Sequence, residues 1–263
     1  MTTYVLGGMD TEMGEIEQLL KVFGHTVVHA IGANGDRVLR RKALECSGPR
    51  PVPGQVWVEC CHQDYSKEEL LSIGVDIVDH HEVGDPGYAR PPAEYWEASS
   101  LGQVCAQIGV SPSKRQRFIA AADHCLLSAY QGECPEVLQE EFTEFRMDFF
   151  HHSNPMEEIL RVRNRIIASP IVNIGEAKVS DVSKIFNSRD SKWLSDAGCM
   201  FGLKTMTRIP KKYGVRIFVS NLESQEIEYF LDHYIVDLGK VLNKYGDEQR
   251  RFAGAMIGGK FDH

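Results

Sequence analysis

Carboxylate and imidazole side chains recur in this sequence close to short apolar runs. They are Asp10 and Glu12, then Glu59, then Asp79, His80 and His81, and finally Asp123. Carboxylate oxygens and imidazole nitrogens together suit divalent ions such as Mn²⁺ or Mg²⁺. Two such ions about 3.5–4 Å apart, bridged by one carboxylate, would activate a water molecule and clamp a phosphoryl group. These residue types therefore predict a metal-assisted hydrolytic site, provided that the fold brings them together.

The elements expected around these residues form a parallel α/β sheet. Strands are predicted over 4–6, 25–31, 55–61 and 75–78, with helices over 13–23 and 66–73 among them. Alternation of strands and helices at this spacing is typical of right-handed βαβ units. Ligands of such sheets bind beyond the carboxyl ends of the strands, so the acidic groups that follow the strands would meet at one edge.

Three further helices are predicted over 97–108, 112–130 and 136–150. The second of them carries Asp123 directly after the apolar run 118–122 (FIAAA). Burial of a carboxylate in such a run costs free energy unless the group is paired or bound to a metal. This position therefore favours Asp123 as a member of the same site.

The pattern predicts two α/β domains joined by a helix. The first domain spans residues 1–150, and a connecting helix that Pro155 begins lies within 151–169. The second, smaller domain spans 170–263. Within it we expect a strand over 214–220, a long amphipathic helix over 223–245 closed by Gly246, and a glycine-rich apolar tail over 252–261.

The run 75–81 (VDIVDHH) resembles the signature strand of the DHH phosphoesterase superfamily. That superfamily includes RecJ-type exonucleases, family II inorganic pyrophosphatases, and oligoribonucleotide and cyclic-dinucleotide phosphodiesterases. Four other stretches are similar to its motifs in the same order: 9–12 (MDTE), 58–59 (VE), 98–104 (ASSLGQV) and 121–123 (AAD). The resemblance covers residues 3–130. It implies a parallel-sheet DHH-type N-terminal domain with a smaller α/β C-terminal domain.

The resemblance also implies a role for each site residue. Asp10 would bind a first Mn²⁺ or Mg²⁺ ion, Glu12, His80 and Asp123 would bind a second, and Glu59 would bridge the two. His81 would face the substrate phosphate, and Asp79 would orient an imidazole, as metal-bound histidines usually require. A water or hydroxide between the ions would be the nucleophile. The implied reaction is hydrolysis of a phosphoester or phosphoanhydride.

The sequence departs from the family pattern in three places. Residues 6–9 (LGGM) stand where many members have a histidine, and Glu12 and Glu59 stand where aspartate is expected. His62 or His124 could substitute as ligands. These departures leave open a catalytically degenerate DHH-like protein that binds a nucleotide or a protein partner. An unrelated α/β protein with a chance DHH tripeptide is a further alternative.

The C-terminal part offers a second candidate for phosphate binding. In many relatives a run of glycines followed by a histidine lies near the end of the second domain. Here Gly258 and Gly259 are followed by Lys260. Glycine amides and an ammonium group could hold a phosphate. A tight turn explains the same residues equally well.

Composition narrows the class of partner. The chain has 263 residues, with 29 basic and 37 acidic side chains and a formal net charge of −8. Long polyanions gain affinity from many Lys and Arg contacts, so this balance favours a small nucleotide, a short oligonucleotide or another small phosphate. A homodimer stays an open alternative.

The cysteines and the apolar runs predict the compartment. Seven cysteines, none in a C-x-x-C pair, argue against a disulfide framework or a thiolate zinc site and favour a reducing cytoplasm. No apolar run approaches the length of a membrane span, and the first residues do not form a secretion signal.

Overall fold

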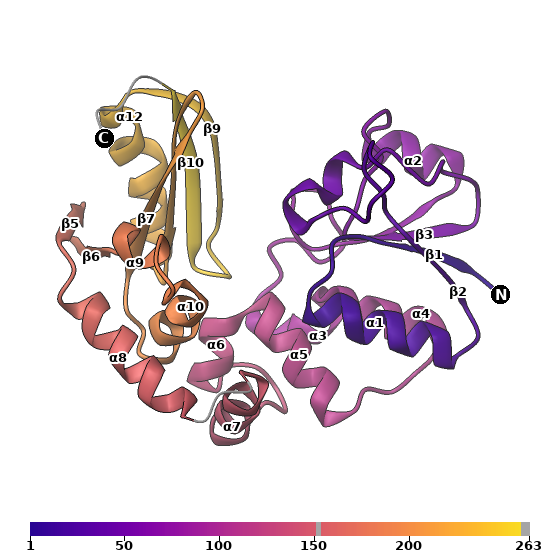
Figure 1. Ribbon diagram of the computed structural model, residues 1–263, viewed down its shortest axis with the longest axis horizontal. Coiled ribbons are helices and arrows are strands. Elements are labelled where there is room, and N and C mark those ends of the chain that lie inside the picture. The colour runs from indigo at the N-terminus through magenta and orange to yellow at the C-terminus, as the bar shows by residue number, and fades with distance from the viewer. Residues whose placement is uncertain (151–153, 259–263) are drawn as a thin grey trace. The chain divides into compact units, whose positions relative to one another are not determined.

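The computed structural model describes residues 1–150 and 154–258, and only the backbone of 40–42. The chain forms two compact units, each with its own sheet (Figure 1). The first unit comprises Met1–His124 with Cys134–Glu136. The second comprises Cys125–Glu133 and Val137–His263.

The first unit contains a four-stranded, fully parallel sheet in the order β2-β1-β3-β4. Its strands are β1 (Thr3–Leu6), β2 (Thr26–His29), β3 (Gln55–Val58) and β4 (Asp76–Val78). Both β1 and β3 lie at the centre and are largely buried, as expected for a parallel sheet that is covered on both faces. The parallel sheet and the α/β class predicted from the sequence are confirmed.

Helices cover both faces of this sheet. Figure 1 shows α1 (Thr11–Val22), α4 (Ser100–Ile108) and α5 (Lys114–His124) on one face and α2 (Lys67–Ile73) on the other. The remaining elements of the unit are η1 (Arg40–Glu45), η2 (Pro92–Glu94) and α3 (Tyr95–Ala98). On the α2 face, Leu70 and Val75 pack in one apolar cluster with Val5 and Trp57 of the central strands.

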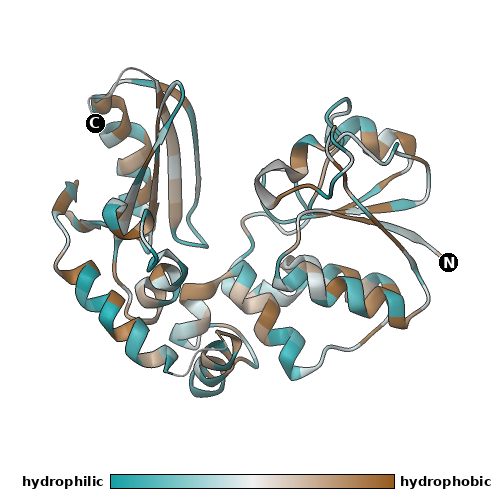
Figure 2. Cartoon of the chain, in the orientation of Figure 1, coloured by the Kyte–Doolittle hydropathy of each residue, from teal (hydrophilic) through white to brown (hydrophobic). Residues whose placement is uncertain are grey.

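Local sequence signals explain where two of these helices begin. Asp10 caps α1 by accepting the N–H of Met13 at 2.8 Å. Ser66 and Glu69 form a reciprocal capping box at the start of α2. Figure 2 shows polar and apolar residues alternating along α1, as expected for a helix with one face on a sheet.

The helices predicted over 97–108 and 112–130 are each interrupted. Ser99 separates α3 from α4 and caps α4 through the N–H of Gly102 at 3.0 Å. Cys125 separates α5 from α6 (Leu126–Gln131), with φ of −148° and ψ of 59°. Neither break follows a glycine or proline. The helical periodicity of the sequence therefore continues across both breaks and predicts uninterrupted helices. The break at Cys125 coincides with the passage of the chain from the first unit to the second.

The second unit contains a six-stranded mixed sheet in the order β5-β6-β7-β8-β10-β9. Only β6 and β7 are paired in parallel. The strands are β5 (Ile171–Ile174), β6 (Ala177–Asp181), β7 (Thr205–Lys211), β8 (Gly214–Ser220), β9 (Lys240–Asp247) and β10 (Phe252–Gly258). The strand predicted over 214–220 is therefore confirmed.

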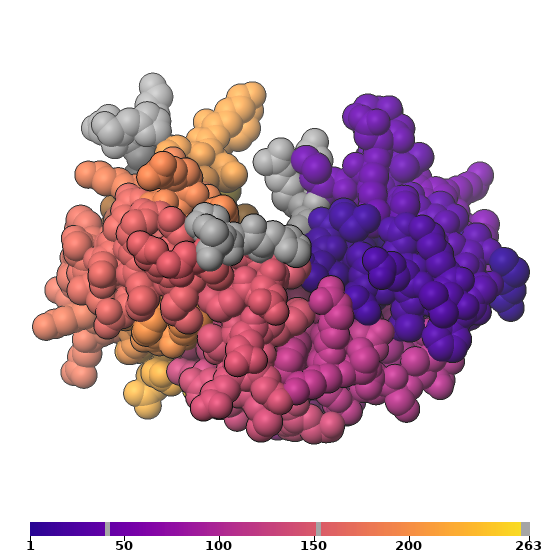
Figure 3. Space-filling view, turned by 60° about the horizontal axis from the view of Figure 1, so that its bottom comes forward, coloured from indigo at the N-terminus to yellow at the C-terminus, as the bar shows by residue number. Residues whose placement is uncertain are grey.

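The second unit also contains helices. They are α6, α7 (Gln139–Phe149), α8 (Pro155–Ile167), α9 (Ser183–Phe186), α10 (Ser191–Met200), α11 (Ser224–Tyr229), η3 (Phe230–Tyr234) and α12 (Ile235–Leu238). The helix that Pro155 begins is present as predicted. Helices α7 and α8 form much of the face of this unit that is turned to the viewer in Figure 3.

The helix predicted over 223–245 is wrong beyond residue 238. Gly239 adopts φ of 142°, a conformation that favours glycine, and the chain then forms β9. β9 pairs antiparallel with β10, so Gly246 lies within a strand and caps no helix. Pairing with β10 outweighs the local helical pattern, which shows that tertiary contacts override propensity here.

Helices α6 and α7 belong to the second unit, although the sequence predicts a first domain that extends to residue 150. Helix α8, expected as the connecting helix within 151–169, belongs to the second unit as well. A buried polar cluster explains the position of the first two. Tyr130 of α6 donates to Oδ1 of Asp196 in α10 at 2.6 Å. Arg146 of α7 donates to both oxygens of the same carboxylate at 2.8 Å. With these helices included, the second unit is not the smaller of the two.

Candidate metal centre

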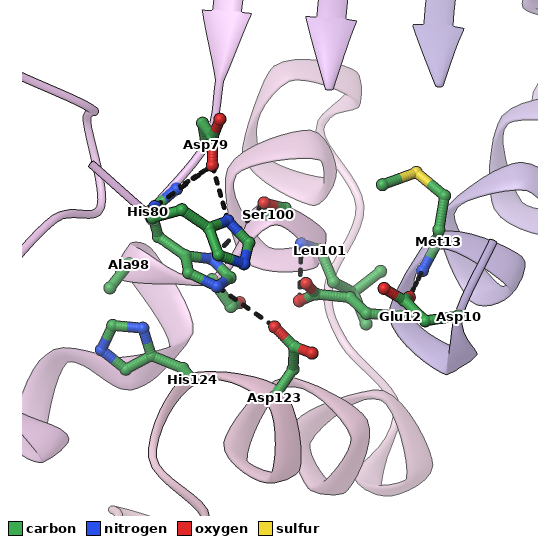
Figure 4. Close-up of polar contacts among 12 residues, drawn as sticks. Asp10, Glu12, Met13, Asp79, His80, Ala98, Ser100, Leu101, Asp123 and His124 are labelled. Carbon is green, nitrogen blue, oxygen red and sulfur yellow. Dashed lines mark hydrogen bonds and ion pairs between the residues drawn. The ribbon is translucent and has the colours of Figure 1, made fainter. Parts of the chain in front are cut away.

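Four predicted site residues converge at the carboxyl edge of the parallel sheet. Glu59 follows β3, His80 and His81 follow β4, and Asp123 lies near the end of α5. Each offers one ligand atom, and these atoms all lie within 4.8 Å of one another. Figure 4 shows His80 and Asp123 pointing toward each other, with Glu12 and Asp10 of the α1 region beside them.

The backbone of Glu59 is held in an unusual conformation. Its N–H donates to the carbonyl of Val78 at 2.9 Å, which continues the β3–β4 ladder by one residue. Its φ is +48°, a left-handed value that is uncommon outside glycine. Such strain persists only where the surrounding structure over-determines it, and it clusters at functional sites. Here it turns a buried carboxylate, whose Oε1 is shielded from solvent, into the cluster.

Asp79 organises the two histidines that follow it. It is 1% exposed, and its Oδ1 accepts the N–H groups of His80 at 2.7 Å and His81 at 3.2 Å. The same oxygen lies 2.8 Å from Nδ1 of His81. An ionised carboxylate can only accept, so Nδ1 carries a proton and Nε2 is the ring nitrogen left for a ligand. Asp79 therefore orients an imidazole, as expected.

Charge around His81 favours its protonated form. Burial alone would lower its pKa, but the hydrogen bond to Asp79 and the negative charges of Glu59 and Asp123 raise the pKa to about 9. Burial likewise opposes ionisation of Asp79, yet its hydrogen bond to His81 holds the pKa of that carboxyl below its usual range. The two groups form a charged pair at neutral pH. The His81 side chain is 39% exposed.

His80 is the most deeply placed member of the cluster. It is completely buried, and its Nδ1 lies 3.5 Å from Oγ of Ser100. Its Nε2 lies 3.1 Å from Oδ2 of Asp123, which is an ion-pair distance, although the nitrogen makes no hydrogen bond in the described part of the chain. The ring stacks on that of His81, with centroids 4.3 Å apart and planes at 22°. This packing leaves the imidazole little freedom to rotate.

Glu12 adds a third carboxylate to the cluster. It is 1% exposed, and its Oε1 accepts the N–H of Leu101 at 3.0 Å. Burial raises the pKa of Glu12 well above its usual range, and the negative charges of Asp123 and Glu59 raise it further. Burial, with the charge of Asp123, also raises the pKa of Glu59. Crowded buried carboxylates of this kind are stabilised when a cation lies between them.

The donor set fits a divalent metal ion. Among the described residues, Oε2 of Glu12, Oε1 of Glu59 and Nε2 of His80 are buried and make no hydrogen bond. Buried polar atoms without partners are uncommon in folded proteins, and atoms of this kind often serve to bind an ion. Carboxylate oxygens with imidazole nitrogens match the preferences of Mn²⁺ and similar ions.

The structure places the other predicted residues differently. Asp10 uses one oxygen to cap α1, although its charge also raises the pKa of Glu59. Gly258 ends β10 and pairs with Gly214 and Lys240, so it lies in a sheet and not in a phosphate-binding loop or a tight turn. Gly259 and Lys260 lie outside the described residues.

The two histidines considered as substitute ligands have other contacts. His124 is buried edge-on to His80, with centroids 5.4 Å apart, and its Nε2 lies 3.2 Å from the carbonyl oxygen of Arg90. Nδ1 of His62 accepts the N–H of Asp64 at 3.2 Å. The geometric cluster of candidate ligands includes neither of them.

Sequence reasoning missed two residues that contact the DHH segment. Lys67, the first residue of α2, lies 2.5 Å from Oδ1 of Asp85 and 3.7 Å from Oδ2 of Asp79. No local signal marks either Lys67 or Asp85, because a lysine at a helix start and an aspartate in a loop are ordinary. The left-handed conformation of Glu59 likewise has no local signal in the sequence, so sequence reasoning did not predict it.

Comparison with known proteins adds no family assignment. No protein-family model, curated protein or solved structure matches this chain. Within the part of the chain that the structure describes, no helix has both the length and the apolar character needed to cross a membrane. Function must therefore be inferred from the geometry of the site.

Proposed function

We propose that this protein is a metal-dependent phosphoesterase that hydrolyses a phosphoester or phosphoanhydride through a metal-activated water. The observation that carries the proposal is the convergence of Glu59, His80, His81 and Asp123 within 4.8 Å. Oε2 of Glu12 and Oε1 of Glu59, which are buried and to which no N–H group of the described residues donates, support it. The DHH-like order of the motifs supplies the reaction class.

The side chains of the cluster would have different roles, which follow from their burial and charge. Glu59, His80 and Asp123 would hold Mn²⁺ or Mg²⁺, and Glu12 would extend the donor set toward a second ion. Such an ion would lower the pKa of a bound water and neutralise charge on a phosphoryl group. His81 is the exposed member, and its Nδ1 donates to Asp79, so its Nε2 edge would face the anionic phosphoryl group. Asp79 keeps that ring oriented.

The substrate class follows from charge and size. The net charge of −8 disfavours long nucleic acids, since these gain affinity from many cationic contacts. We therefore propose a small nucleotide, a short oligonucleotide or another small phosphate as the substrate. A cytoplasmic location agrees with free cysteines throughout the described chain, and a homodimer remains part of the proposal to be tested by sedimentation.

A second candidate function is favoured by one specific contact. A Cβ atom on Gly7 would lie 2.3 Å from the carbonyl oxygen of Glu59, so this position cannot carry the ligand histidine that many DHH proteins have nearby. A site that holds only one ion would suit a degenerate DHH-like protein that binds a nucleotide or a protein partner.

Hydrolysis of small phosphodiesters distinguishes the two candidates. The purified chain would be assayed with Mn²⁺ on bis-p-nitrophenyl phosphate and on a series of dinucleotides and short oligonucleotides. We expect activity that His80→Ala lowers by more than about a hundredfold, because a ligand matters more than its supporting residues. His25→Ala is the matched control, since His25 lies on the opposite end of β2 from the site and packs on Tyr4. Mn²⁺ binding without turnover on any of these substrates would favour the degenerate protein.

A further inference from the structure

One lysine faces three carboxylates beside the DHH segment. Nζ of Lys67 lies 2.5 Å from Oδ1 of Asp85, 3.3 Å from Oε2 of Glu82 and 3.7 Å from Oδ2 of Asp79. The Asp79 and Asp85 side chains are 1% and 0% exposed, whereas Glu82 is half exposed. Buried carboxylates require a cation or hydrogen bonds. Lys67 supplies a positive charge to both carboxylates and a hydrogen bond to Asp85.

Asp85 fixes the backbone that carries His81. Its Oδ2 accepts the N–H of His81 at 3.1 Å and that of Glu82 at 2.7 Å, while Oδ1 binds Lys67. The N–H of Asp85 in turn donates to the carbonyl of Glu82 at 3.0 Å, which closes the turn. Lys67 therefore anchors, through one carboxylate, the loop that begins at the second histidine.

Both carboxylate oxygens of Asp79 have neighbouring groups. Its Oδ1 is used by His80 and His81, and its Oδ2 faces Lys67. A carboxylate with both oxygens engaged cannot swing toward the Glu59 cluster and act as a ligand there. Lys67 thus holds Asp79 in the position that orients the His81 ring, and Glu59 and Asp123 remain the carboxylates that can bind metal.

We infer that Lys67 is a positioning residue of this centre, acting through Asp85 and Asp79 on the orientation of His81. The inference rests on the proposed function for its link to a metal, but the geometry of the link from Lys67 to His81 exists without one. Loss of the ammonium group would leave two buried carboxylates to repel each other. The 81–85 turn would then open and the His81 ring would lose its fixed orientation.

Two measurements on the full chain test the inference. The first is ¹⁵N NMR of the His81 imidazole in metal-free protein, where the hydrogen bond to Asp79 is visible as a protected Nδ1–H. The second is Mn²⁺ affinity by calorimetry. The variants are Lys67→Met, which keeps the aliphatic stem, and Lys67→Arg, which keeps the charge. The matched control is Lys21→Met, because Lys21 also makes a 2.7 Å ion pair, with Glu17 on α1.

We expect Lys67→Met to lose the protected Nδ1–H signal and to bind Mn²⁺ about ten- to a hundredfold more weakly, which is typical for supporting residues of metal sites. Lys67→Arg should restore most of both, and Lys21→Met should change neither. Adding Asp85→Asn to Lys67→Met should lower the affinity no further, because the two residues act as one unit.

The results separate this inference from the proposed function. An unchanged His81 signal in folded Lys67→Met overturns the positioning role, whatever happens to Mn²⁺ affinity. A Lys67→Met variant that loses Mn²⁺ affinity only in proportion to its loss of thermal stability, and is not rescued by Lys67→Arg, overturns it as well. A wild-type chain that shows the His81 signal but binds no Mn²⁺ overturns the proposed function while the link from Lys67 to His81 stands.

Discussion

Gly7 and Glu59 pass so close to each other that no side chain fits between them. A Cβ atom on Gly7 would lie 2.3 Å from the carbonyl oxygen of Glu59 and 3.2 Å from that of Val58. The N–H of Gly7 donates to the latter at 3.0 Å, so the approach is part of the β1–β3 ladder. The same contact that holds the backbone of Glu59 against β1 therefore leaves no room at position 7 for a ligand side chain.

Gly7→Ala should disturb the site through this contact. We expect a loss of about 1–3 kcal/mol in the free energy of unfolding, as for overpacking of a buried site, together with weaker Mn²⁺ binding because Glu59 must move. Urea unfolding and calorimetry measure the two effects. Gly14→Ala is the control, since its Cβ would meet nothing nearer than 3.8 Å and alanine favours a helix by up to about 1 kcal/mol. Equal behaviour of the two variants would contradict the close approach.

Metal removal should destabilise the first unit. A ligand that binds only the folded state adds about 2.7 kcal/mol to the free energy of unfolding when its concentration is a hundred times its Kd. Mn²⁺ should therefore raise Tm, and a chelator should lower it. Glu12→Gln removes one crowded carboxylate. We expect this variant to be at least as stable as wild type without metal and to gain less from Mn²⁺. Differential scanning calorimetry with and without Mn²⁺ gives both values. A metal-free Glu12→Gln protein less stable than wild type would show that the carboxylates do not repel each other.

Acid should weaken α1 through Glu17. Burial opposes its ionisation, but hydrogen bonds to Lys21 and His29 and their charges lower the pKa of Glu17 to about 2. A carboxyl with a pKa lowered on folding stabilises the protein above its ordinary value of 4.5, and this stabilisation is lost as the pH falls toward about 2. The effect is about 1 kcal/mol or less, because Lys21 is exposed to solvent.

Glu17→Gln isolates this effect. The variant should be less stable than wild type at pH 6, and the difference should vanish as the pH approaches 2. Urea unfolding at a series of pH values measures it, with Glu15→Gln as the control on the same helix. A difference that grows on acidification would have the wrong sign for a lowered pKa.

The second unit should be sensitive to substitution of Asp196. Its carboxylate is 2% exposed and is bound by Arg146 through two hydrogen bonds and by Tyr130 through a third. Asp196→Ala would leave the guanidinium of Arg146, whose side chain is 14% exposed, without its partner, which costs up to about 3–5 kcal/mol. Urea unfolding of the full chain measures the loss. Asp232→Ala removes the exposed pair with Lys244 and should change little. Comparable losses in both variants would argue against the buried cluster as the link between α6, α7 and α10.

Local signals predicted the parts of the fold that depend on local interactions. Apolar runs and the Ser66 capping box located β1, β3 and α2, because burial and capping act within a few residues. The gathering of acidic groups at one sheet edge followed from the carboxyl ends of parallel strands. Glu59, His80 and Asp123 meet there as predicted.

The features that the sequence did not predict depend on contacts between residues that are distant in sequence. The break at Cys125 and the conversion of 240–247 into β9 are fixed by packing within the units and by pairing with β10. The ion pair of Lys67 with Asp85 joins residues 18 positions apart, and neither residue carries a signal in its own neighbourhood. Such contacts have no period and no motif, so a single sequence does not reveal them.

Metal content is the most direct test of the central claim. The chain would be loaded with Mn²⁺, dialysed, and measured by elemental mass spectrometry beside His80→Ala and the control His25→Ala. We predict one to two equivalents of Mn in wild type and in the control, and a marked loss in His80→Ala, because the buried Nε2 of His80 is a proposed ligand of the centre. A wild-type chain without Mn, or an equal content in all three proteins, would contradict a metal centre at this edge of the sheet.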